Sequence, residues 1–213
     1  MSSVDPAATR EPAAAPAAVP RESLARVSTT YLNGLPLRTG DLIFTVDGNR
    51  DTFLGEFWLI VGRMIPGVVD HVAIYIGPGR RCVEAGARGE VIAFDLAGHR
   101  WEASAMAAER GLIDRLYGIA DPIEGRGIPP GQEQEIRLRV AEYCLAQIGK
   151  PYNLNFFDSD TEEAFYCSQL VYKAYLPHGI DFNTGRGIPG FEPSRSIVYP
   201  QEVWEACPMR ARM

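Results

Sequence analysis

Cys167 stands at a position that suits a thiol nucleophile. It follows an acidic loop and precedes apolar residues at helical spacing, which predicts that it starts a helix. The free amide groups and the positive dipole end of a helix N-terminus stabilise a thiolate. A lone cysteine is also often a small, buried apolar side chain, so its position alone leaves both interpretations open.

A thiolate nucleophile needs a base, and the base needs an acceptor that orients it. Among the three histidines, His71 heads an apolar strand. Glu84 stands in the next expected strand, beyond the turn Gly77-Pro78-Gly79, and antiparallel pairing would place it beside His71. A histidine at a strand edge can also simply cap a sheet, and a glutamate in a strand commonly faces solvent. The other histidines, His99 and His178, stand in turns typical of a protein surface.

Tyr152 follows the predicted helix stop at Gly149 and could bring a phenol toward the nucleophile as an oxyanion donor, or it could be a packing side chain.

Cys82 and Cys144 fall inside a strand and a helix, and Cys207 lies near a C-terminus expected to fray. No C-x-x-C pair is present, so we expect free thiols and no zinc site. An acidic loop lacks the glycine and the terminal glutamate spacing of a calcium loop; its acids are Asp158, Asp160, Glu162 and Glu163. No metal or organic cofactor is expected.

Short apolar runs bounded by glycine and proline predict a meander of strands around His71. The meander consists of His71–Gly79, Arg81–Ala85 and Glu90–Phe94. Leu35–Thr45 is expected to be a turn that leads into a short buried strand, and Leu112–Ile119 is a further strand candidate. Helical spacing indicates further segments, with Ala103–Glu109 ambiguous. The predicted helices are Thr52–Met64, Gln134–Ala146 and one from Cys167 that ends before Pro177, beyond which a loop-rich tail is expected.

The 213-residue chain has the composition of a globular protein, with 46% hydrophobic and 23% charged residues. We expect one domain over residues 23–213, preceded by a disordered Ala- and Pro-rich tail over residues 1–22. A net charge of −6 and a pI of about 5.2 provide no basic field, so nucleic acid is not an expected partner. No transmembrane segment or secretory signal is evident, and a cytoplasmic location is therefore expected.

Three segments carry a resemblance to a known family. They are Gly40-Asp41-Leu42-Ile43-Phe44, then Asp70–Gly77 with Val83-Glu84-Ala85, then Ile148–Tyr152 with Phe165–Val171. Together they resemble the circularly permuted NlpC-type papain-like cysteine hydrolases. The YiiX/YebB-like branch, related to the lecithin:retinol acyltransferase-like proteins, is nearest. In ordinary NlpC-type enzymes the cysteine helix precedes the histidine strand, whereas here the histidine strand comes first, as in the permuted group.

The resemblance implies an α+β fold in which a small antiparallel sheet packs on the helix that carries the cysteine. It implies that Cys167 is the nucleophile, that His71 is the general base and acid, and that Glu84 orients the imidazole. Candidate oxyanion or substrate-binding residues are Tyr152, Tyr166 and Ser168. The Asp70 before the histidine, the Thr52–Met64 helix and the Ala103–Gly131 segment depart from the family pattern.

Three functional hypotheses follow. The leading one is a cysteine peptidase or amidase that forms a thioester with a small peptide, and the resemblance implies cell-wall-type peptides as one substrate class. An acyltransferase or lipid esterase is the second, because an apolar acyl groove could be lined by Phe53, Phe57, Trp58, Ile60 and Met64, although these residues also fit an ordinary core. The third is a catalytically inactive binding module that uses the N-terminal tail as a tether.

Overall fold

The computed structural model describes residues 26–46 and 67–213. The tail expected over residues 1–22 and the helix expected over Thr52–Met64 lie outside these residues, as do the side chains suggested for an acyl groove.

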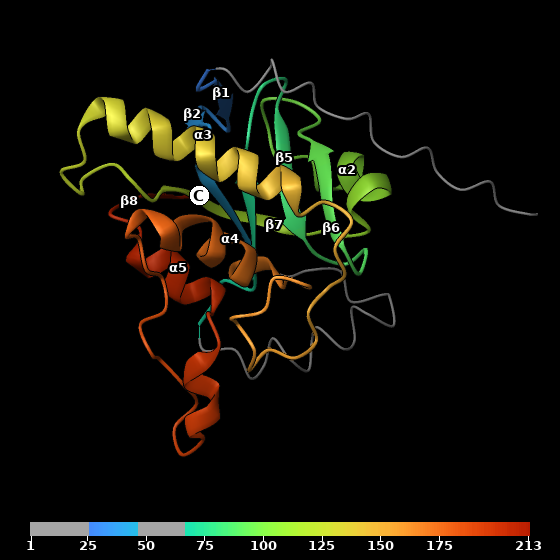
Figure 1. Cartoon of the computed structure of the whole chain (residues 1–213). Helices are drawn as coiled ribbons and strands as arrows, with labels where there is room; N and C mark the ends of the chain where they lie inside the picture. Colours follow the sequence, from blue (N-terminus) through green and yellow to red (C-terminus); the bar gives the residue numbers. More distant parts are fainter. Residues whose placement is uncertain (1–25, 47–66) are drawn as a thin grey trace, which may run out of the picture.

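A six-stranded antiparallel sheet forms the centre of the molecule, in the order β6-β5-β4-β3-β7-β8 (Figure 1). Its two middle strands, β3 and β4, are buried along their whole length and consist mainly of β-branched and aromatic residues, which suit a pleated surface covered on both faces. The strands are β3 Leu42–Val46, β4 His71–Tyr75, β5 Arg81–Ala85, β6 Val91–Asp95, β7 Arg115–Asp121 and β8 Met209–Arg212. A separate hairpin pairs β1 Thr29–Leu32 with β2 Leu35–Arg38.

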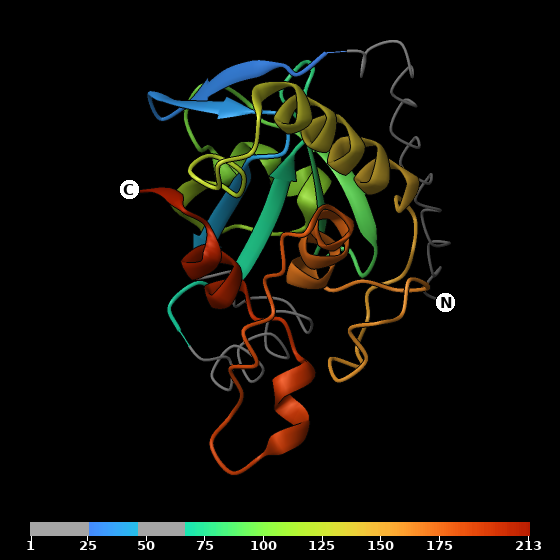
Figure 2. The same cartoon turned by 60° about the vertical axis from the view of Figure 1, so that its left-hand side comes forward.

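Helices cover both faces of the sheet and divide the core in two. One apolar cluster joins the sheet to α3 Pro130–Ala146, α4 Cys167–Tyr175 and α5 Pro200–Ala206. The other joins the opposite face to α2 Ala103–Arg110 and to the β1–β2 hairpin. Two short 3-10 helices, η2 Leu176–His178 and η3 Glu192–Ser196, follow α4, and the segment that holds η3 extends away from the sheet (Figures 1 and 2). The cluster on each face buries large side chains, so both layers stabilise the sheet.

A buried arginine ties α3 to the sheet. Arg137 Nη1 donates to Asp41 Oδ1 at 2.7 Å, and its Nη2 donates to Asp121 Oδ2 at 2.6 Å. Burial raises the pKa of Asp41 to about 7, with the Asp121 charge adding to this effect and Arg137 opposing it. The Gly40-Asp41 motif therefore has a structural role, because the Asp41 side chain hydrogen-bonds the guanidinium that anchors α3.

The meander from β4 to β6 and the helices α3 and α4 confirm the sequence predictions, and α4 begins at Cys167 as expected. The ambiguous segment after Glu102 is a helix. The prediction of a loop-rich tail beyond Pro177 is wrong in part, because α5 and β8 form there and β8 pairs with β7. Cys207 is accordingly buried rather than frayed.

Candidate active site

The structure brings Cys167, His71 and Glu84 together. The Nε2 atom of His71 lies 2.9 Å from Oε2 of Glu84. The imidazole also hydrogen-bonds the Cys167 side chain, and because Nε2 is engaged by the carboxylate, Nδ1 is the nitrogen that faces the sulfur. Glu84 is 1% exposed, while Cys167 is 6% and His71 9% exposed, so the carboxylate is the most deeply buried of the three.

Strand alternation and strand order explain this meeting. Tyr75 and Cys82 are opposite each other in the β4–β5 ladder, so the alternation places His71 and Glu84 on the same face as these two residues. That face belongs to the α2 layer, whereas Cys167 begins α4 in the other layer. His71 is the first residue of β4. From this strand end its ring contacts Glu84, which faces the α2 layer, and Cys167, which belongs to the α4 layer.

The electrostatics favour a charged imidazole. Burial opposes the charge on His71, but the Glu84 carboxylate and the hydrogen bonds to Cys167 and Glu84 outweigh burial and raise its pKa to about 10. Burial likewise opposes the charge on Glu84, yet Arg110 and His71 lower its pKa to about 2. A thiol that gives its proton to the neutral imidazole leaves a thiolate beside an imidazolium, and the thiolate is the nucleophile.

Arg110 is a member of this cluster that sequence reasoning missed. It is the last residue of α2, is fully buried, and donates to both oxygens of Glu84. The only sequence signal is its place just after the expected Ala103–Glu109 helix, and an arginine there is ordinarily exposed.

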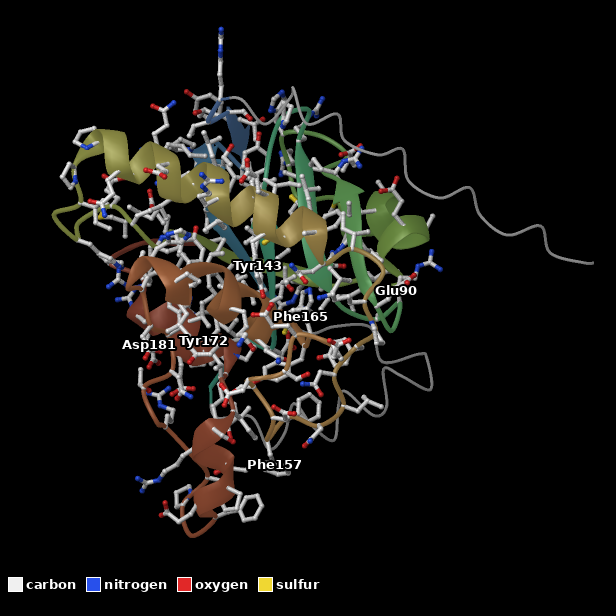
Figure 3. The ribbon with its side chains drawn as sticks, viewed as in Figure 1. Glu90, Tyr143, Phe157, Phe165, Tyr172 and Asp181 are labelled. Carbon is white, nitrogen blue, oxygen red and sulfur yellow. The ribbon has the colours of Figure 1, made fainter. Side chains whose placement is uncertain are left out.

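Tyr152 lies beside the start of the helix that carries the nucleophile. The segment around this tyrosine is held on one side by the start of β6 and the turn before that strand, through Tyr152 N–H to the Gly89 carbonyl at 2.7 Å and Val91 N–H to the Lys150 carbonyl at 2.8 Å. On the other side it pairs with Phe165, whose ring packs edge-on against Tyr143 of α3 with centroids 6.4 Å apart (Figure 3). The Tyr152 hydroxyl accepts a hydrogen bond from the backbone amide of Cys167. Its phenol therefore lies beside the first amide of α4.

Two buried amide side chains, also missed from the sequence, fix the turn into α4. Gln169 Oε1 accepts from the Tyr166 amide at 3.2 Å and from Asn153 Nδ2 at 3.0 Å. Its Nε2 donates to the Thr161 carbonyl at 3.0 Å, while Asn153 Nδ2 also donates to the Asp158 carbonyl at 2.9 Å. The backbone carbonyls of Asp158 and Thr161 thus attach the acidic loop to the side chains of Asn153 and Gln169, and Gln169 belongs to the helix that carries the sulfur.

Tyr166 and Ser168 flank the sulfur in sequence but direct their hydroxyl groups to Val198. The Val198 amide donates to Tyr166 Oη at 3.1 Å, and Ser168 Oγ donates to the Val198 carbonyl at 2.7 Å. These bonds attach the segment before α5 to the start of α4.

The remaining cysteines have a different environment. Cys82, Cys144 and Cys207 are buried free thiols, and burial raises the pKa of each.

Within residues 26–46 and 67–213, no group of three or more His, Cys, Asp and Glu side chains is placed to hold a metal ion. None of the helices in these ranges has the length and apolarity that a bilayer span requires.

Comparison with known proteins agrees with this geometry. The family model described as "Permuted papain-like amidase enzyme, YaeF/YiiX, C92 family" matches residues 36–205. Among solved structures, the chain is similar to one titled metalloprotein yiiX from Escherichia coli O157:H7, with 17% identity and a TM-score of 0.51. That alignment covers 82% of this chain and 95% of the other, and it supports the same fold. No curated protein matches.

Proposed function

The chain belongs to the YaeF/YiiX C92 family of permuted papain-like amidases, and on that premise we propose that Cys167, His71 and Glu84 are its catalytic residues. Membership in an amidase family implies a cysteine hydrolase with a peptide-type substrate. The observation that carries the proposal is the continuous hydrogen-bonded line from the Cys167 sulfur through His71 to Glu84. A cysteine, a histidine and an orienting group are hydrogen-bonded in the same order in thiol hydrolases of unrelated sequence, where they act as nucleophile, base and orienting acceptor.

Acylation begins with the thiolate of Cys167 and the imidazolium of His71. The sulfur attacks the carbonyl carbon of the amide, and the carbonyl oxygen takes the negative charge of a tetrahedral intermediate. The intermediate collapses as the C–N bond breaks, and His71 gives its Nδ1 proton to the departing nitrogen. The products of this half-reaction are a free amine, a thioester on Cys167 and a neutral imidazole.

Deacylation restores the starting state. The neutral His71 takes a proton from a water molecule as its oxygen attacks the thioester carbonyl. The C–S bond then breaks, which releases the carboxylic acid and returns the thiolate opposite a charged imidazole. Glu84 remains a carboxylate throughout and stabilises the imidazolium of the resting state.

The developing oxyanion has two donors within reach. The Cys167 amide points out of the first turn of α4, where it lacks a partner within the helix, and the Tyr152 hydroxyl lies against it. As an oxyanion develops at this position, the amide hydrogen turns from the phenol oxygen to the oxyanion, and the phenol O–H donates to the same oxyanion. Each such donor contributes ~3 kcal/mol of transition-state stabilisation.

The substrate class is tested by trapping the thioester. The protein is incubated with a γ-D-glutamyl peptide, an ordinary α-linked peptide and a fluorescent phospholipid, and intact-protein mass spectrometry follows adducts on Cys167. We expect a peptide-derived acyl adduct, with the γ-D-glutamyl peptide preferred, and no adduct on Cys167→Ala. An adduct from the phospholipid alone would instead identify a lipid acyl hydrolase or transferase. Turnover of peptide by Cys167→Ala at the parent rate would reject the proposed nucleophile.

A further inference from the structure

The guanidinium of Arg110 bonds both oxygens of Glu84, including the one that bonds His71. Its Nε lies 3.0 Å from Glu84 Oε1, and its Nη2 lies 2.9 Å from Glu84 Oε2. Both carboxylate oxygens are therefore bonded in the planar fork geometry that arginine provides and lysine does not. Oε2 is also the oxygen that bonds His71, so the fork sets the plane in which the carboxylate meets the imidazole.

Arg110 is itself fixed on every side. Its Nη1 and Nη2 each lie 2.9 Å from one oxygen of Asp114. The guanidinium carbon lies 4.8 Å from the ring centroid of Phe94 and 4.9 Å from that of Trp101, where it interacts with both aromatic faces. A group with bonds in its plane and rings against it has little freedom, so the orientation that it gives Glu84 is rigid.

The permanent charge of Arg110 determines whether the proton of the Glu84–His71 pair resides on the carboxylate or on the imidazole. Glu84 and His71 are buried together, and in a medium of low polarity the proton of such a pair can move to the carboxylate, leaving two neutral groups. An arginine cannot be deprotonated in a protein. Its positive charge next to Glu84 stabilises the carboxylate, and the proton then stays on His71.

The other ionisable groups around Glu84 do not supply this charge. Cys82 on the same strand is a buried thiol whose pKa burial raises, so it is neutral. Asp114, behind Arg110, is negative, and Cys167 from α4 faces the far nitrogen of the imidazole. Arg110 is thus the only cation besides His71 that bonds Glu84 in the described part of the chain.

We propose that Arg110 is a positioning residue of the reaction, which keeps Glu84 ionised and aligned so that the proton of the Glu84–His71 pair remains on the imidazole. This inference rests on the proposed function, because His71 must carry that proton to protonate the leaving nitrogen. Arg110 acts through Glu84 and does not touch the substrate.

The test measures the ionisation of Glu84 directly. The protein is labelled with ¹³C at the glutamate carboxyl carbons, the Glu84 signal is assigned with Glu84→Gln, and its chemical shift is followed against pH. Arg110→Met is expected to move the Glu84 titration upward by about 1 to 3 pH units, because a cation in contact is lost. Arg110→Lys, which keeps the charge, is expected to titrate near the parent. The alkylation rate of Cys167 at neutral pH is recorded for each variant and is expected to fall in Arg110→Met.

Arg137→Met is the matched control. Arg137 is also buried but bonds Asp41 and Asp121 instead. Its loss is expected to lower stability without moving the Glu84 titration. An unchanged Glu84 titration in Arg110→Met, or an equal movement in Arg137→Met, would overturn the inference. If Arg110→Met does not fold, the double variant Arg110→Gln with Asp114→Asn removes both charges, and it must show the same upward direction.

The outcome is separable from that of the proposed function. An inert parent Cys167, or peptide turnover by Cys167→Ala, would reject the hydrolase mechanism and leave the Glu84 titration unaffected. A reactive parent Cys167 with an unmoved Glu84 titration would reject the role of Arg110 alone.

Discussion

His71 Nε2 and Glu84 Oε2 lie 2.9 Å apart, and the carboxylate is the more deeply buried of the two. This arrangement differs from a surface ion pair, because solvent neither screens the attraction nor competes for the carboxylate. The imidazole is therefore held at one nitrogen by a charge and presents the other nitrogen to Cys167.

Removing the charge of Glu84 is expected to slow the reaction strongly. Glu84→Gln keeps the size of the side chain but cannot stabilise the imidazolium, so the pKa of His71 falls from its value of about 10. We expect kcat/KM for a peptide substrate to fall by about 10²- to 10⁴-fold, the contribution typical of general acid–base catalysis. Parent-like kcat/KM in the folded variant would contradict a role for the carboxylate.

The His71–Glu84 pair also predicts how stability depends on pH. The pKa of His71 rises from 6.5 to about 10 on folding, so its stabilising contribution is complete below pH 6.5 and is lost as the pH rises toward about 10. The pKa of Glu84 falls from 4.5 to about 2, so its contribution is present above pH 4.5 and is lost as the pH falls toward about 2. The free energy of unfolding is measured against pH by urea denaturation for the parent and for His71→Asn. The difference between them is expected to shrink between pH 6.5 and about 10, and a constant difference would refute this linkage.

Tyr152→Phe tests the phenol as an oxyanion donor. The substitution removes one hydroxyl beside the Cys167 amide and leaves the ring in place. We expect kcat to fall by about 10²-fold with little change in KM, because the bond forms only as the oxyanion develops. Steady-state kinetics on one peptide measures both constants, and an unaltered kcat would remove Tyr152 from the mechanism.

Ser168→Ala separates a structural hydroxyl from a substrate contact. Ser168 is buried and bonds the Val198 carbonyl, so its loss leaves that acceptor without this donor. A decrease of ~1 to 3 kcal/mol in the free energy of unfolding is expected, with KM unchanged. A raised KM at parent stability would show instead that Ser168 contacts substrate.

Local patterns in the sequence account for the strands and helices that carry Cys167, His71 and Glu84. The short apolar runs of β4 and β5 and the helical spacing after Cys167 are properties of neighbouring residues, so the predicted elements form where expected. Contacts between distant segments were not predictable in this way. Arg110 is buried only because α2 packs against β6. There Phe94 and Trp101 lie against the guanidinium, and the carboxylates of Glu84 and Asp114 accept its hydrogen bonds.

The C-terminal elements show a second reason for failure. The β8 strand reads Met-Arg-Ala-Arg, whose alternation spans only four residues and which has no β-branched or aromatic residue. It forms because β7 presents unpaired backbone groups at the sheet edge, and backbone pairing carries no signal in the side chains. The α5 helix is only seven residues long, too short for periodicity to stand out.

The reactivity of the four cysteines tests the central claim most directly. The parent and His71→Ala are treated briefly with iodoacetamide at about pH 6, and peptide mass spectrometry measures the labelling of each thiol. We predict that Cys167 is labelled first and that His71→Ala loses this fast labelling, while Cys82, Cys144 and Cys207 stay slow in both. Labelling of Cys167 no faster than that of Cys207, or fast labelling that persists without His71, would contradict a thiolate–imidazolium active site.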